Sequence, residues 1–104
     1  MDQIEAMAEQ FKLLSDKSRL TILSLLKERE LCVCDIVGLL GVSQPNASQH
    51  LRKLKAGSLV NETRKGKWVY YSLNLDDKPY IQAVLEHTPS FTEEIARLKT
   101  NNCC

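Results

Sequence analysis

Residues 41–57 read GVSQPNASQHLRKLKAG, and this stretch decides the fold. Gly41 can adopt the left-handed conformation that ends one helix, and Ser43 is a favoured residue for starting the next. Pro45 is tolerated in the first turn of a helix, where its missing N–H would have had no helical partner. Gly57 is typical of the position just after a helix. The stretch therefore predicts a turn followed by a helix that ends at Gly57.

The predicted helix has an apolar face and a polar face. Ala47, Leu51 and Leu54 recur at helical spacing and are expected to face the core. Asparagine and glutamine can pair with adenine edges, and arginine and lysine with guanine edges or phosphates. The alternative is an ordinary exposed surface, but small uncharged residues in the first two turns favour contact with a groove. The expected DNA-contacting residues are Ser43, Gln44, Asn46, Ser48, Gln49, His50, Arg52 and Lys53.

A short helix ahead of this segment and a hairpin behind it complete a recognisable pattern. A helix beginning near residue 35 makes residues 35–57 a predicted helix-turn-helix. Apolar residues then alternate, which predicts a β-hairpin at about 60–73 with a tight turn around Lys65–Gly66. A helix-turn-helix followed by a basic hairpin is a winged helix. The hairpin tip adds three expected DNA contacts: Arg64, Lys65 and Lys67.

The hairpin also carries three aromatic residues, Trp68, Tyr70 and Tyr71. They could stack on bases, but aromatic residues in strands more often pack in the core or against the neighbouring strand. We expect packing rather than base contact.

Composition and charge fit one domain that meets a polyanion. The chain has 104 residues, 26% of them charged and 43% apolar, as expected for a single globular domain spanning 1–104. It has no apolar run long enough to span a membrane, and its acidic start does not resemble a signal peptide, so we expect a cytoplasmic location. Residues 43–73 contain six basic residues and one acidic residue. A basic middle between acidic flanks predicts that one face binds nucleic acid.

Further helices are expected on both sides of the winged segment. Apolar spacing predicts a first helix from Ile4 to Leu14, and Asp16 can cap a second helix over about 16–30. Two more helices are expected at about 77–100. Ser90 and Glu93 can form a capping box at the start of the second of them.

The outer helices carry more apolar surface than a small domain can cover. Ile4, Phe11, Ile81 and Leu98 lie on these apolar stripes. Pairing the stripes in a homodimer would bury them and would supply the two-fold symmetry that such modules use on DNA. The expected fold is mainly α with a small β-hairpin, a dimeric winged helix-turn-helix.

The cysteines form two close pairs, Cys32/Cys34 in ELCVCDI (30–36) and Cys103/Cys104 at the end. In a helix, residues two apart point to nearly opposite sides, so Cys32 and Cys34 can share one ion only if the segment is locally extended. Four cysteines in a cytosolic chain indicate metal binding or redox chemistry rather than a disulfide framework. The terminal pair supplies further candidate ligands or is a frayed tail.

Four stretches in a fixed order now resemble a known family. LLSDKSRLTILSLL, ELCVCDI, LGVSQPNASQHLRKLKAGSLV and RKGKWVYYSL, between about Ala8 and Leu75, are similar to the ArsR/SmtB metalloregulators. The resemblance implies a dimeric winged-helix repressor that leaves DNA when a metal or metalloid binds. In this family ELCVCD is a thiolate signature of arsenite/antimonite sensors and of cadmium/lead sensors. The resemblance therefore implies that Cys32 and Cys34 are the first two ligands.

The chain departs from the family pattern at the remaining ligands. Val37 stands where the enterobacterial type of arsenite sensor has a third cysteine, and no cysteine precedes Cys32, in contrast to the cadmium type. Asp76, Asp77 and His87 do not reproduce the spacing of the family's site on the last helix.

A third thiolate from Cys103 or Cys104, of the same subunit or its partner, stays open. Two or three thiolates suit As(III) or Sb(III), which we expect as the inducer. Cd(II) or Pb(II), which prefer three or four thiolates, are the alternative. Ligation is expected to draw Cys32 and Cys34 to one side and to distort residues 35–40, the first helix of the helix-turn-helix.

Two further interpretations belong to other functional classes. One is a winged-helix repressor that senses thiol redox state rather than a metal. The other is a thiol enzyme such as a metalloid reductase. The sequence has neither a phosphate-binding loop nor a CX₅R nucleophile cradle, so we do not expect an enzyme.

Overall fold

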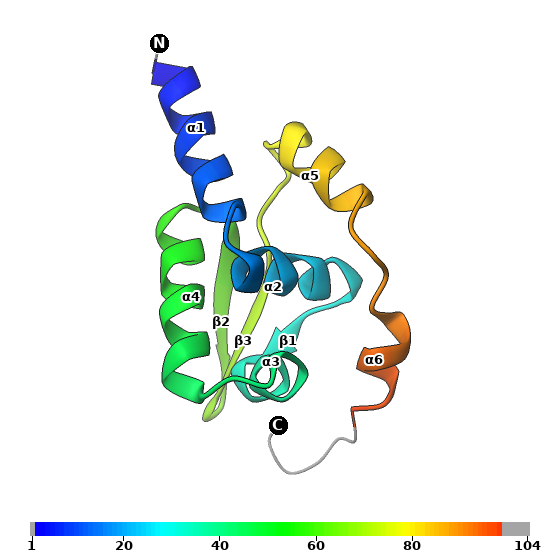
Figure 1. Ribbon diagram of the computed structural model, residues 1–104. Coiled ribbons are helices and arrows are strands. Elements are labelled where there is room, and N and C mark those ends of the chain that lie inside the picture. Colours follow the sequence, from blue (N-terminus) through cyan, green and yellow to red (C-terminus); the bar gives the residue numbers. More distant parts are fainter. Residues whose placement is uncertain (1, 99–104) are drawn as a thin grey trace.

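The computed structural model describes residues 2–98, and this part of the chain forms six helices and three strands (Figure 1). The helix-turn-helix and the wing lie in the middle of the chain, and α1 projects from one end of the molecule (Figure 1). No described helix is both long and apolar enough to cross a membrane. In chain order the elements are α1 (Asp2–Leu14), α2 (Lys17–Glu28), β1 (Leu31–Cys32), α3 (Val33–Leu40), α4 (Gln44–Ala56), β2 (Val60–Lys65), β3 (Trp68–Leu73), α5 (Pro79–Glu86) and α6 (Thr92–Ala96).

Local capping explains where the central helices begin and end. The side chain of Asp16 accepts a hydrogen bond from the backbone N–H of Arg19 at 3.0 Å and starts α2. Ser43 does the same for α4 by accepting from Asn46 at 3.3 Å. Gly41 ends α3 in the left-handed conformation, with φ of 71°. These three capping residues confirm the turn and helix starts predicted from the sequence.

The wing is a β2–β3 hairpin, and a third strand, β1, extends its sheet. The strand order is β1-β3-β2 and all pairings are antiparallel. Lys65 pairs with Trp68, so the turn lies at Gly66 and Lys67, one residue later than predicted. Gly66 has a φ of +65°, which a residue without a Cβ adopts at little cost. The added strand β1 places Cys32 opposite Tyr70.

The core lies between the inner faces of α2, α3 and α4, the sheet and α5. Ala47, Leu51 and Leu54 of α4 are fully buried, as their spacing predicted. Ile81 of α5 is also fully buried within the chain, so its prediction as part of an exposed dimer stripe is wrong. Its helix packs on α2, and Ile81 fills the monomer core there.

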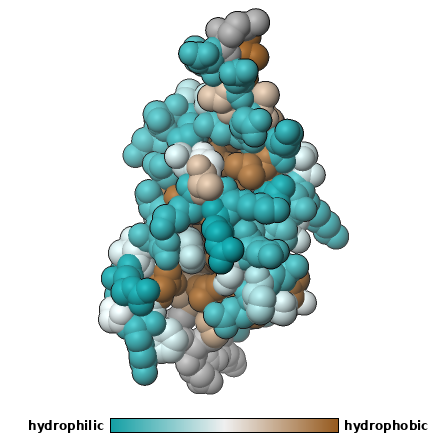
Figure 2. All heavy atoms as spheres, turned by 90° about the vertical axis from the view of Figure 1, so that its left-hand side faces the viewer, coloured by the Kyte–Doolittle hydropathy of each residue, from teal (hydrophilic) through white to brown (hydrophobic). Residues whose placement is uncertain are grey.

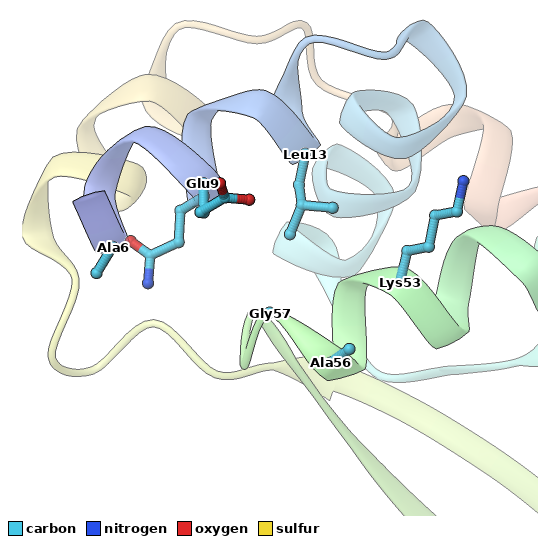
Figure 3. Close-up of a pocket in the computed structure, with 7 residues that line it drawn as sticks. Ala6, Glu9, Leu13, Lys53, Ala56 and Gly57 are labelled. Carbon is cyan, nitrogen blue, oxygen red and sulfur yellow. The ribbon is translucent and has the colours of Figure 1, made fainter.

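The end of α4 is shaped by close packing against α1 (Figure 3). A Cβ atom added to Gly57 would clash with Cδ1 of Leu13. Gly57 itself has a φ of −86°, whereas Ser58 adopts the left-handed conformation with φ of 62°. Gly57 thus ends the helix as predicted but is required for close approach rather than for a positive φ. A cavity of about 500 Å³ remains between the helices, lined by Ala6, Glu9, Gln10, Leu13, Lys53, Ala56 and Gly57.

The predicted capping box before α6 is not formed. Phe91, not Ser90, is the N-cap residue, and the Ser90 hydroxyl accepts a hydrogen bond from the Thr92 N–H rather than from Glu93. Glu28 at the end of α2 instead accepts hydrogen bonds from the Phe91 N–H at 3.3 Å and the Thr92 hydroxyl at 3.1 Å. It also accepts one from the Ser90 hydroxyl at 3.4 Å. A tertiary partner therefore replaces the local one.

Candidate nucleic-acid interface and cysteine site

Most of the polar face predicted on α4 is open to solvent. Figure 2 views the side of the molecule that carries α4 in Figure 1, and this face is largely hydrophilic with small hydrophobic patches. Ser48 and His50 are half-buried. The burial of Leu51 and Leu54 turns the opposite side of the helix outward. The exposed members of the predicted set are Ser43, Gln44, Asn46, Gln49, Arg52 and Lys53.

His50 points toward the start of α2. Its Nδ1 atom lies 3.9 Å from Oδ2 of Asp16 and 3.5 Å from Nη1 of Arg19. Its side chain is 17% exposed. The Arg19 backbone N–H lowers the pKa of Asp16, and the Arg19 and His50 charges lower that pKa further. The structure thus gives His50 a contact within the chain, and its DNA contact stays a prediction.

The wing presents its basic residues at the surface. Arg64, Lys65 and Lys67 are exposed. The ammonium group of Lys67 lies over the Trp68 ring, 5.6 Å from its centroid. Trp68 is 36% exposed, so the expected core packing does not apply to it, although it does face Lys65 across the hairpin. At the basic tip of the wing, Lys67 therefore stacks on an aromatic side chain, and all three cationic side chains are exposed.

A polar hollow of about 320 Å³ lies between α4 and the wing strands. Arg52 and Lys55 of α4 line it together with Glu62 and Tyr71 of the sheet, beside Ser48. Lys55 forms an ion pair with Glu62. Burial raises the pKa of the Tyr71 hydroxyl, which stays protonated at neutral pH. Lys55 was not among the predicted DNA-contacting residues, and Tyr71 was expected to pack; their meeting in this hollow could not be predicted because the sequence does not show that the strands pass beside α4.

The cysteine pair lies at the junction of β1 and α3. Cys32 is the extended residue immediately before α3 and is 1% exposed, whereas Cys34 is helical and half-buried. The Asp35 carboxylate accepts a hydrogen bond from the Cys32 N–H at 3.5 Å, and its Oδ2 lies 3.3 Å from Cys32 Sγ. Since Cys32 is already extended, no helical turn has to unwind there for the two sulfurs to approach each other.

Neither of these two cysteines is a free thiol in the structure, because both are disulfide-bonded. This differs from the expected pair of thiolates. A disulfide sulfur carries no negative charge for a metal, so the pair can act as soft ligands only after reduction.

Within residues 2–98 the cysteine pair is not part of a larger cluster of candidate metal ligands. Across that range no group of three or more histidine, cysteine or acidic residues could hold a metal ion. Asp76, Asp77 and His87 are exposed. Cys103 and Cys104 lie outside the described residues. The described donors therefore fit an ion that accepts two thiolates and takes any further ligand from elsewhere.

Comparison with known proteins gives a family match over the segment that contains the helix-turn-helix. Residues 16–62 match the model of the family described as bacterial regulatory protein, arsR family. The chain is 46% identical over 74 residues to the arsenical resistance operon repressor of Escherichia coli, covering 70% of this chain and 60% of that protein. It is 37% identical over 86 residues to the arsenic resistance regulator ArsR1 of Pseudomonas putida, covering 81% and 66%.

A cadmium regulator and a solved structure extend the comparison. A homologue of the cadmium resistance regulator CadC from Staphylococcus aureus is 38% identical over 92 residues, covering 88% of this chain and 74% of that protein. A homodimeric winged helix-turn-helix DNA-binding domain from Mycobacterium bovis superposes with a TM-score of 0.74 at 28% identity, covering 97% and 92%. The chain spans less than two thirds of the length of the two arsenic regulators. It belongs to the ArsR family of bacterial regulatory proteins.

Proposed function

We propose that this chain is a homodimeric repressor that binds operator DNA and leaves it when As(III) or Sb(III) binds reduced Cys32 and Cys34. The observation that carries the proposal is the position of the cysteine pair. It begins α3, the first helix of the helix-turn-helix, and α3 packs on α4, whose outer face is polar and exposed. A ligand at this junction is therefore one helix away from the DNA-facing surface.

The DNA contacts are proposed to come from α4 and the wing. Gln44, Asn46 and Gln49 are exposed amides that can pair with adenine edges in the major groove. Arg52 and Lys53 follow them on the same helix and can reach guanine edges or phosphates. Arg64, Lys65 and Lys67 extend from the wing and fix the register through phosphate contacts.

The homodimer is proposed to form through the outer helices. Ile4 is 63% exposed and Phe11 39% exposed on α1. Tyr80 links α1 to α5, because its ring lies 5.9 Å from that of Phe11 and its hydroxyl donates to Gln10 at 2.7 Å. Exposed apolar side chains on a braced helix fit a subunit interface. Two-fold pairing would present two copies of α4 to successive turns of the DNA major groove.

Release follows from competition between two states of the β1–α3 junction. Thiolates are soft ligands that favour thiophilic ions. Binding to both sulfurs would fix the Cys32–Cys34 geometry and shift α3 relative to α4. A differential affinity of about 1–3 kcal/mol between the two states would weaken operator binding by about 5–150-fold, and DNA would weaken ligand binding equally.

The identity of the inducer rests on the number of sulfur donors. Two thiolates and one additional ligand suit trigonal As(III) or Sb(III). Cd(II) or Pb(II) is the alternative, since those ions prefer three or four thiolates, and cadmium regulators are among the relatives. Cys103 or Cys104 is the proposed source of any third thiolate.

A redox-sensing repressor is a second candidate, favoured by the disulfide state of Cys32 and Cys34. In that case oxidation and reduction of the cysteines, rather than an ion, would set the position of α3. Peroxide would then release the DNA whereas arsenite would not.

The test is a titration of the reduced protein on an operator selected by the protein from a random duplex library. Fluorescence anisotropy would follow DNA release by arsenite, antimonite, cadmium, lead and zinc, with peroxide as the redox arm. Release by arsenite and antimonite at the lowest concentrations supports the proposal. A protein that responds to none of the five ions contradicts it.

The double variant Cys103→Ser/Cys104→Ser separates the two possible ligand sets. Release that persists but needs more arsenite would make the terminal pair an auxiliary ligand. An unchanged titration would leave a site of two thiolates completed by water or an added thiol.

A further inference from the structure

Lys65 of the wing is held by groups next to the cysteine pair. Its ammonium group lies 2.8 Å from Oε1 of Glu30, the residue directly before β1. It also lies over the ring of Tyr70, 4.7 Å from the centroid. Tyr70 is the cross-strand partner of Cys32. Both contacts of Lys65 therefore come from residues that adjoin Cys32 in the chain or across the sheet.

We propose that Glu30 is a positioning residue that couples the cysteine site to the wing by competing with DNA phosphate for Lys65. The inference rests on the proposed function, since it concerns how release is transmitted. In the DNA-bound state Lys65 contacts phosphate and leaves Glu30. In the ligand-bound state β1 is fixed, Glu30 retains Lys65, and the wing loses one phosphate contact.

The charges support this exchange. The hydrogen bond and charge of Glu30 raise the pKa of Lys65, which favours the ammonium form while the two residues are paired. A carboxylate and a phosphate are both anionic oxygen acceptors that repel each other, so a phosphate that approaches Lys65 competes with Glu30 for its ammonium group. Because the pair is exposed to solvent, it is weak enough to exchange, and its effect is expected to be a few-fold rather than all-or-none.

The chain offers a matched control in a second ion pair of the same kind. Lys55 pairs with Glu62, and the side chains of this pair are 56% and 31% exposed, compared with 54% and 36% for Lys65 and Glu30. Glu62 lies on β2 opposite Tyr71, and β3 separates its strand from β1, which carries Cys32. Loss of either carboxylate removes one negative charge near the proposed DNA-contacting face. Only the loss of the Glu30 carboxylate is expected to break the coupling between the cysteine site and the wing.

The experiment compares wild type, E30Q and E62Q on the selected operator, each with and without arsenite. Both variants are expected to bind DNA more tightly than wild type because a negative charge is removed. The ratio of affinities without and with arsenite is expected to fall about two- to fivefold in E30Q and to stay at the wild-type value in E62Q. Equal ratios in all three proteins, or an equal fall in both variants, would overturn the coupling.

A second measurement needs no DNA. Trp68 is the single tryptophan, and it faces Lys65 across the hairpin. Arsenite is expected to change its fluorescence in wild type and E62Q and to change it less in E30Q. An equal fluorescence change in E30Q and wild type would also contradict the coupling. A wild type that keeps its DNA in arsenite would instead contradict the proposed function itself.

Discussion

The β1–α3 junction and the outer face of α4 are neighbours in the helix-turn-helix, but they are built in opposite ways. At the junction Cys32 is 1% exposed and Ile36 is fully buried, so a change of geometry there reaches the core. On α4 the amide side chains of Gln44, Asn46 and Gln49 and the basic side chains of Arg52 and Lys53 are exposed. The proposed ligand site is thus embedded in the core, where a change can be passed on, whereas the proposed DNA-contacting face stands clear of it.

This comparison separates two kinds of mutational effect. Substitutions at the junction should alter stability or the response to an inducer. Substitutions on the outer face of α4 should alter DNA binding and leave the folded chain intact.

The largest effect is expected for Ile36→Ala. This side chain is fully buried on α3, and its truncation should lower the free energy of unfolding by about 2–5 kcal/mol. Gly38→Ala on the same helix is the control, because within residues 2–98 no atom beyond the adjacent residues and the backbone of α3 lies within 4 Å of the added Cβ. It should raise stability by about 0.5–1 kcal/mol through helix propensity. Urea unfolding measures both, and equal stability of the two variants would show that α3 is not anchored in the core.

The next effect is expected for Gln49→Ala on the exposed face. It should weaken operator binding by about 1–3 kcal/mol, with little change in binding to random DNA or in stability. Anisotropy titrations on the two DNAs provide the comparison. An equal loss on both would mean that α4 reads DNA through another part of its surface.

Structural features that are set by neighbouring residues in the sequence could be predicted, whereas features that are set by tertiary contacts could not. The caps at Asp16 and Ser43, the left-handed Gly41 and the buried face of α4 follow from short-range patterns, and the structure confirms them. The left-handed conformation of Ser58 was not predicted, because the glycine beside it suggested that any such residue would be Gly57. Gly57 is instead needed for its close contact with Leu13 of another helix.

Several features depend on partners that are distant in the sequence. The strand Leu31–Cys32 is too short to show alternation and exists because β3 pairs with it. The Ser90 capping box gives way to hydrogen bonds with Glu28. On α4 the polar spacing correctly indicated the exposed face, but the turn of His50 toward Asp16 required knowledge of where α2 begins.

A smaller effect is expected for Arg64→Ala at the wing. Arg64 is exposed, and its proposed role is a phosphate contact without base readout. Its removal should weaken operator and random DNA alike and reduce the slope of log affinity against log salt by about one. A loss confined to the operator would instead assign Arg64 to base recognition.

The smallest effect is expected from the acid dependence of Glu28. The Phe91 N–H and the Ser90 and Thr92 hydroxyls lower its pKa below the ordinary value of 4.5. Its contribution to stability is therefore present above that value and is lost as the pH falls below it. Glu28→Gln should be less stable than wild type at pH 7, and the difference should shrink toward pH 3. A stability difference that does not change with pH would contradict a stabilising role for the ionised Glu28 carboxylate.

The central claim is that ligation at the β1–α3 junction releases the DNA held by α4 and the wing. Its most direct test is arsenite titration of reduced wild type, Cys32→Ser and Cys34→Ser, each bound to the selected operator. All three should bind DNA with similar affinity, because the outer face of α4 is unchanged. Wild type should be released, and neither variant should respond, since a serine hydroxyl is not a soft anionic ligand at neutral pH. Release of Cys32→Ser at the arsenite concentration that releases wild type would contradict the account.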